Sequence, residues 1–266
     1  MKRLTTPAAP LSPAAHDGDT DAIVLIKAAP QVGRRHGETV CCAAVDREGR
    51  WLRLYPVRFR QLEQAKRFGR WDIVRFHWRT PRDDARPESR RVEENSIEIV
   101  GKLKEGERQK FLAPLIRTSL RREREAGRTL ALLNVEVLEF SWERRSEDEI
   151  SRERSDFRAI TLQTDLFNTR PLIPYEPSPY VFRYRYRCDD GERQGTCQDW
   201  EIDTTFFKWC RKYGEEAALE RIHCVFGEDY PRKGMLLAMG THSLYPDTWL
   251  INGVIRFDPV AQTSLF

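Results

Sequence analysis

Hydrophobic and polar residues alternate along the segment GRWLRLYPVRFR in the way that a β-strand requires. Successive side chains of a strand point to opposite faces of a sheet. Leu52 and Leu54 would therefore lie on the buried face, and Trp51, Arg53 and Tyr55 on the other. The pattern predicts a strand that shows two aromatic rings and a guanidinium to the solvent.

The same alternation recurs along the chain and outweighs helical periodicity. Strands are expected at 22–28, 39–45, 51–55, 71–79, 96–100, 130–142 and 180–187, and in the segments MLLAMGTH and TWLINGVIRF near the end of the chain. Helices are expected at 59–67, at 107–124, and from Asp203, which is a good N-cap residue. Asp46 to Gly49 has the composition of a hairpin turn.

Two β-rich halves with few helices flank a charged, proline-rich segment. Short strands with hairpin signals favour small barrels over a parallel α/β sheet. The predicted fold is a β-rich α+β protein with two small barrel-like domains, of OB-like or PUA-like type. The expected division is a disordered tail at 1–20, an N-terminal barrel-like domain with one helix at 21–142, a linker at 143–179 and a C-terminal α+β domain at 180–266.

Composition narrows the function classes only slightly. The net charge of the 266 residues is +4, and arginine greatly outnumbers lysine. Arginine suits planar contacts with phosphates and bases.

No apolar run approaches the roughly 20 residues that cross a bilayer, and no signal-peptide core follows the N-terminus, so a cytoplasmic protein without membrane contact is expected. The six cysteines are then expected to be free thiols. The sequence contains no Walker-type loop, G-x-G-x-x-G or G-x-S-x-G, which argues against a nucleotide-driven motor or a serine hydrolase.

Arginines and aromatic residues are interleaved on three of the expected strands, at 51–55, 71–79 and 180–187. Exposed rings can stack on unpaired bases, at about 1–3 kcal/mol per base, while arginine binds phosphates. These strands and their loops predict a nucleic-acid interface made of Trp51, Arg53, Tyr55, Arg58, Arg60, Arg75, Arg79, Arg90, Arg91, Arg34 and Arg35. A merely solvated face is the alternative, because arginine, tyrosine and tryptophan are common on strands. For the loop TPRDDARPESRR the alternative is pairing of its arginines with its own acids.

Two further patterns suggest metal sites as alternatives to a nucleic-acid interface. Asp199 and Glu201, with Lys208 nearby, would suit a metal-dependent nuclease if both acids shared a strand face. Cys188 and Cys197 flank a turn and are a weak zinc pattern, because their spacing is wider than a zinc knuckle. The cofactor expected is none, with a divalent metal or zinc as the alternative. A protein-interaction subunit, whose arginine face meets an acidic partner, also stays open.

The strings from Cys41 to Asp46 and from Gly49 to Pro56 resemble the opening of the first barrel in the dual OB-domain proteins, a prokaryotic group. Tyr55 before the proline departs from that pattern. The segments DWEID, MLLAMGTH and TWLINGVIRF are similar to the C-terminal part of a related uncharacterised group. The resemblance implies a DNA- or RNA-binding β-barrel protein that recognises foreign or modified nucleic acid in antiviral defence, together with other subunits of the defence system. It implies no catalytic residue, so the expected function is binding rather than an enzyme.

Overall fold

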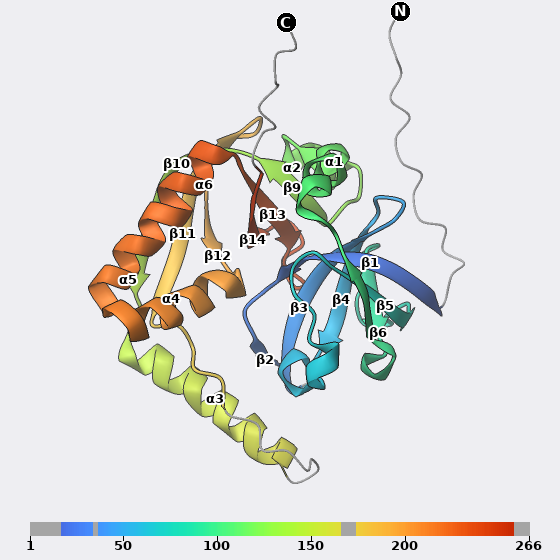
Figure 1. Ribbon diagram of the computed structural model, residues 1–266, viewed down its shortest axis with the longest axis horizontal. Helices are drawn as coiled ribbons and strands as arrows, with labels where there is room; N and C mark the ends of the chain where they lie inside the picture. Colours follow the sequence, from blue (N-terminus) through green and yellow to red (C-terminus); the bar gives the residue numbers. More distant parts are fainter. Residues whose placement is uncertain (1–16, 34–36, 166–173, 258–266) are drawn as a thin grey trace, which may run out of the picture.

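The computed structural model describes residues 17–33, 37–165 and 174–257 (Figure 1). Two seven-stranded sheets and a few helices make up this part of the chain. The expected β-rich α+β class is therefore confirmed. No helix among the described residues is long and apolar enough to cross a membrane.

The first sheet contains a closed five-stranded barrel. Its order is β1-β3-β4-β6-β5, and β5 pairs with β1 to close it; β2 extends β3, and β7 extends β5. All of these pairs are antiparallel except β4 with β6. The strands are β1 (Asp17–Lys27), β2 (Gln31–Gly33), β3 (Gly37–Asp46), β4 (Trp51–Val57), β5 (Asp72–Arg79), β6 (Ser89–Val92) and β7 (Glu98–Lys102).

Alternation along each strand fills the barrel interior. Leu52 and Leu54 of β4 point inward, as predicted, and pack with Val24, Ala44 and Phe76 from neighbouring strands. Short 3-10 turns follow β4, β6 and β7. They are η1 (Phe59–Gln61), η2 (Gln64–Lys66), η3 (Glu94–Ser96) and η4 (Glu105–Glu107). The helix expected at 59–67 is therefore replaced by two short turns.

The second sheet has the order β10-β11-β12-β14-β13-β9-β8, so β10 and β8 lie at its two ends. Its strands are β8 (Ile116–Arg117), β9 (Leu130–Asn134), β10 (Glu136–Arg144), β11 (Tyr180–Cys188), β12 (Gly191–Cys197), β13 (Met235–Thr241) and β14 (Trp249–Arg256). The helical segments of this half are α1 (Arg108–Leu112), η5 (Ala113–Leu115), α2 (Leu120–Glu125), α3 (Glu147–Asp165), α4 (Trp200–Tyr213), α5 (Glu215–Ile222), the π-helix η6 (His223–Asp229) and α6 (Tyr230–Lys233).

The two faces of the second sheet bury different partners. Ala131 and Leu133 of β9 pack in a core with residues of α4 and α5. Leu130 and Leu132 point the opposite way and pack against the outer face of the barrel. Figure 1 shows the resulting layers, with the helices α4 to α6 on one side, the second sheet in the middle and the barrel on the other side.

Several predicted boundaries are wrong. Asp17 to Thr20, which were expected in a disordered tail, pair with β5; residues 1–16 lie outside the described part. The helix expected at 107–124 is divided into α1, η5, β8 and α2, since Pro114 interrupts it. The sheets divide the chain near residue 115 rather than at 142, because β9 and β10 pair within the second sheet. The charge-dense segment at 143–157, expected as a solvated helix or part of the linker at 143–179, contains most of the helix α3, so the helix alternative is the right one there.

Candidate nucleic-acid interface

The outer face of β4 is covered by the second half of the protein. Trp51 is 9% exposed and packs with Leu130 and Leu132 of β9. Arg53 is 2% exposed, and Tyr55 is partly buried. The expectation that this face meets the solvent is therefore wrong for Trp51 and Arg53. The predicted alternation is correct, but alternation within one strand does not reveal that a second sheet packs against its outer face.

Arg53 is a buried cation that makes no direct ion pair with a carboxylate of the described residues, although the nearby Glu88 charge favours its charged form. Its Nη2 atom donates to the carbonyl oxygen and to the hydroxyl of Thr129, at 3.1 Å each. The Thr129 hydroxyl in turn donates to Glu88, at 2.6 Å. Among the described residues the Arg53 side chain donates to these Thr129 atoms, no ion pair of Arg53 is found, and its Nε atom has no hydrogen-bond partner. Burial lowers the pKa of Arg53, because desolvation disfavours the charged form.

Arg53 lies at the wall of a groove between the barrel and the second sheet. The groove has a volume of about 890 Å³. The barrel contributes the segment after β1, the outer faces of β3 and β4 and the loop between β5 and β6, and the other half contributes the β13–β14 connection. Its lining includes Gln31, Gly33, Cys41, Arg53, Tyr55, Pro81, Asp84, Arg86, Pro87, Arg91, Thr129, Thr241, His242, Leu244, Pro246, Leu250 and Asn252.

The loop between β5 and β6 is fixed across this groove. Asp84 accepts hydrogen bonds from the Nε and Nη2 atoms of Arg86, at 2.8 and 2.7 Å, and from the Ser89 hydroxyl, at 2.6 Å. Arg86 also donates to the Thr241 carbonyl oxygen, at 2.9 Å, which joins the barrel to β13. Burial alone would raise the pKa of Asp84, but these hydrogen bonds outweigh it and lower the pKa to about 2. The self-paired alternative therefore holds for Arg86.

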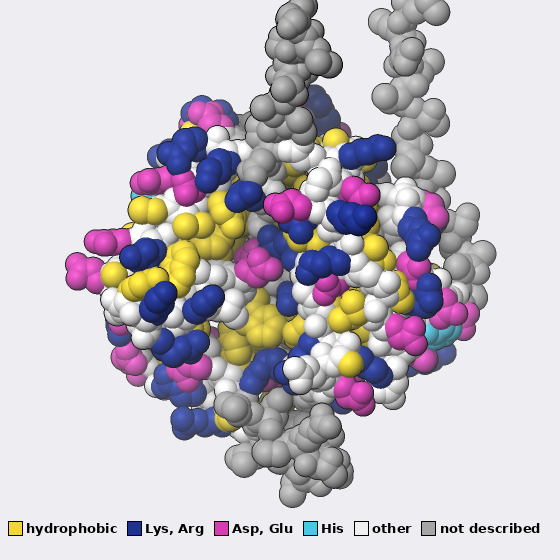
Figure 2. All heavy atoms as spheres, viewed as in Figure 1, with side chains coloured by type: hydrophobic (Ala, Val, Ile, Leu, Met, Phe, Trp, Pro, Cys, Tyr) yellow, Lys and Arg dark blue, Asp and Glu magenta, His cyan; other side chains and the backbone are white. Residues whose placement is uncertain are grey.

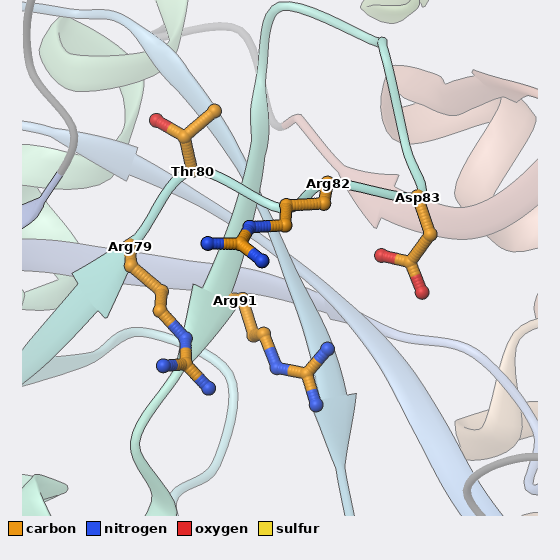
Figure 3. Close-up of a pocket in the computed structure, with 5 residues that line it drawn as sticks. All are labelled: Arg79, Thr80, Arg82, Asp83 and Arg91. Carbon is orange, nitrogen blue, oxygen red and sulfur yellow. The ribbon is translucent and has the colours of Figure 1, made fainter.

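A second pocket of about 470 Å³ adjoins the groove and shares Asp83 and Arg91 with it. Figure 3 shows Arg79, Arg82 and Arg91 with their guanidinium groups around a common space. Asp83 also lines the pocket, and in Figure 3 its side chain lies apart from these groups. Arg79 and Arg82 are exposed, and Arg91 is half-buried. We call these residues the arginine trio.

Most other arginines expected at the interface have acidic or aromatic partners. Arg58 pairs with Glu94 at 2.6 Å, Arg60 with Glu38 at 2.8 Å and Arg75 with Asp21 at 2.8 Å. Arg90 is buried, with its guanidinium 4.4 Å from the centre of the Trp78 ring. Figure 2 shows the same tendency on one face, where basic and acidic side chains lie next to each other. Arg34 and Arg35 lie outside the described residues.

The strand β11 carries the third arginine-aromatic pattern, and its charges are also matched. Tyr184 and Tyr186 point into the core, while Arg183, Arg185 and Arg187 lie on the other face. Each of these arginines pairs with a glutamate on β10, and two of them also pair with Glu192 on β12. This face is a ladder of ion pairs that satisfies its own charge.

The predicted metal-binding acids do not share a strand face. Asp199 is buried and is the N-cap of α4, accepting from the Glu201 amide at 2.9 Å. Its carboxylate also accepts from Arg70, at 2.9 Å, and the Glu201 carboxylate lies 3.3 Å from the same guanidinium. Lys208 is exposed, two helical turns further along α4. The pair is therefore a helix cap and an ion pair, and the predicted N-cap at Asp203 is wrong by one helical turn.

The cysteines do not form the predicted zinc pair. Cys188 lies opposite Gly191 at the turn of the β11–β12 hairpin, whereas Cys197 lies opposite Phe182. Six residues of strand separate these positions, or about 20 Å. All six cysteines are free, as expected. In the described part of the chain no group of three or more potential metal ligands is found.

Sequence reasoning missed the contribution of the second half to the groove. Thr129, Thr241, His242 and Leu244 carry no recognisable motif, and they reach the barrel only because the sheets pack together. Leu244 is 77% exposed in a turn next to Tyr245 and Pro246. Two adjacent large apolar residues, Leu244 and Tyr245, in the segment between two predicted strands are the sequence signal that could have indicated this contact.

Two family models match adjacent parts of the chain, and the boundary between them coincides with the boundary between the two sheets. Residues 19–116 match a family model described as "Domain of unknown function (DUF8758)". Residues 115–266 match a model described as "Domain of unknown function (DUF8757)". The two matches meet at β8, where the second sheet begins. None of the curated proteins matches the chain.

Proposed function

Over the larger part of its length the chain belongs to the family described as Domain of unknown function (DUF8757), and we propose that its groove binds nucleic acid. The observation that carries this proposal is the buried Arg53 at the groove wall. A buried cation without a carboxylate contact is costly, and an anionic ligand would offset that cost. The Nε atom of Arg53 and the Oγ1 atom of Thr241 are both buried without a hydrogen-bond partner among the described residues, and both residues line the groove.

The barrel topology supports the same proposal. We infer that the barrel is of the OB type, because five strands close in the order β1-β3-β4-β6-β5 with a single parallel pair. In OB folds the face of the second and third strands, with the loops between strands 1 and 2 and between strands 4 and 5, binds oligonucleotides or oligosaccharides. The corresponding parts here are β3, β4, the segment after β1 and the loop between β5 and β6. All four line the groove.

The lining has the mixture that nucleic acid requires. Tyr55, Pro81 and Leu244 offer flat or apolar surfaces to bases, and Arg91 offers charge to phosphates. Recognition of foreign or modified nucleic acid in antiviral defence remains a prediction that rests on the resemblance of the barrel strings. The groove supports the proposal that nucleic acid binds, but not the prediction that the bound nucleic acid is foreign or modified.

The test measures binding of fluorescent single-stranded and duplex DNA and RNA by anisotropy at low and moderate salt. Leu244→Glu places a carboxylate at the rim of the groove on a side chain that is 77% exposed, so folding is retained. We expect it to weaken binding by about fivefold to tenfold, through repulsion of phosphates and loss of an apolar contact.

The matched control is Val100→Glu, which adds the same charge at a side chain that is 40% exposed on β7 and is not part of the groove lining. It should bind like the wild type. The proposal is wrong if no oligonucleotide binds, or if both variants weaken binding equally. Binding of an acidic protein partner in place of every oligonucleotide would support the protein-interaction alternative.

A further inference from the structure

The arginine trio concentrates positive charge that makes no ion pair with any acidic side chain of the described residues. No ion pair of Arg79, Arg82 or Arg91 occurs among the described residues, although Arg58, Arg75 and Arg86 nearby all have acidic partners within 3 Å. The trio therefore differs from the surrounding basic surface. Its guanidinium groups surround a pocket of about 470 Å³ instead of lying along a surface ladder.

The backbone holds part of this charge together. Arg79 of β5 and Arg91 of β6 are directly opposite each other in an antiparallel pair. Like charges in such a position are destabilising, and cross-strand pairs contribute on the order of 0.2–1 kcal/mol. Arg82 brings a third charge from the loop. An anion between them would convert this repulsion into attraction.

We propose that the arginine trio binds phosphate groups of a single-stranded nucleic acid whose bases occupy the adjoining groove. This inference rests on the function proposed for the groove. The pocket and the groove share Asp83 and Arg91, so one strand can extend from one into the other.

The shape of the groove favours a single strand over a duplex. Its apolar lining faces inward between two walls, one from the barrel and one from the β13–β14 connection. A duplex presents phosphates on its outside and hides the faces of its bases, whereas a single strand exposes them for stacking. The phosphates that leave the groove would then meet Arg91 first and Arg79 and Arg82 beyond it.

The test compares the wild type with the triple variant Arg79→Ala, Arg82→Ala, Arg91→Ala. Anisotropy is measured with single-stranded and duplex oligonucleotides of equal length over a range of salt concentrations. We expect the wild type to prefer the single strand. The triple variant should lose at least tenfold in affinity, and the slope of log affinity against log salt should fall by about 2, because each single-strand phosphate contact contributes about 0.7.

The matched control is Arg121→Ala, Arg152→Ala, Arg158→Ala, which removes the same net charge from exposed arginines of α2 and α3. It should keep the wild-type salt slope within about 0.5. Thermal unfolding checks that the trio variant is folded, and its midpoint should not fall, because a repulsive pair has been removed.

The outcomes separate this inference from the proposed function. If the wild type binds single strands, Leu244→Glu weakens binding and the trio variant binds normally, the groove proposal stands and the trio is not a phosphate site. If the wild type prefers duplex, the single-strand inference is wrong. If no oligonucleotide binds, both proposals are wrong.

Discussion

At the scale of single residues, Asp84 holds the loop between β5 and β6 in place at the groove. Its carboxylate binds Arg86 and Ser89, and Arg86 reaches on to the Thr241 carbonyl oxygen. One carboxylate thereby fixes the loop, the start of β6 and the contact with the second half. These hydrogen bonds stabilise the ionised carboxylate and lower the pKa of Asp84 to about 2.

This arrangement predicts a pH dependence. The pKa of Asp84 is about 2 in the folded protein, below its ordinary value of 3.8. The ionised carboxylate therefore stabilises the fold above about pH 5, and the contribution is lost as the pH falls toward 2. Asp84→Asn should be less stable than the wild type at pH 7, and the difference should shrink on acidification.

Urea unfolding at pH 7, 4 and 3 measures this difference. Asp156→Asn, at an exposed position of α3, is the control and should follow the wild type at each pH. A stability difference between Asp84→Asn and the wild type that stays constant over this range would contradict the assignment.

The residue scale also shows where sequence reasoning succeeds and where it stops. Leu52 and Leu54 were correctly placed inside the barrel, because period-two alternation is a local property of the strand. Trp51 and Arg53 were misplaced, because their environment is set by β9 and Thr129, far along the chain. Arg79 and Arg91 were named as candidates, but their opposition across β5 and β6 depends on a strand pairing that the sequence does not show.

At the scale of elements, α4 is joined to both halves through its N-cap. Asp199 accepts from the amides of Glu201 and Val254 and from the guanidinium of Arg70, which is itself largely buried. The predicted start at Asp203 was wrong because the sequence offers two acids one helical turn apart. Only the packing of β14 and Arg70 against the first of them decides between the two.

We expect Asp199→Ala to lower the free energy of unfolding by about 3 kcal/mol or more. The variant loses a helix cap, which contributes about 0.5–2 kcal/mol, and leaves the Arg70 charge buried without the nearer of its two carboxylate partners. Asp199→Asn keeps a capping oxygen and should lose less. Urea denaturation of both variants measures the effect.

Glu216→Ala, in the exposed first turn of α5, is the control and should change the free energy of unfolding by less than about 0.5 kcal/mol. Equal stability of Asp199→Ala and this control would show that the cap and the ion pair contribute nothing.

At the scale of the whole molecule, the barrel and the second sheet share one core. Ile23, Leu25 and Val45 on the outside of the barrel pack with Leu132 and Leu236 of the second sheet. Two adjacent family regions therefore form a single packed body, and the groove exists only where the two meet. Sequence patterns predicted a β-rich fold correctly but could not predict this packing, because the alternation along a strand does not show which other element covers each of its faces.

Because the core is shared, a cavity at the contact between the sheet and the barrel should lower the local stability of both halves. Leu132 and Leu133 are adjacent on β9 and both fully buried, but they point to opposite faces. Replacing either by alanine removes the same atoms and should lower the free energy of unfolding by about 2–5 kcal/mol.

We expect Leu132→Ala to reduce hydrogen-exchange protection in β1 and β3 of the barrel as well as in β9. Leu133→Ala should reduce protection in β9 and α5 and leave β1 and β3 near the wild type. If β1 and β3 kept wild-type protection in both variants, the barrel would be stable independently of the second sheet. The two walls of the groove would then be free to move relative to each other.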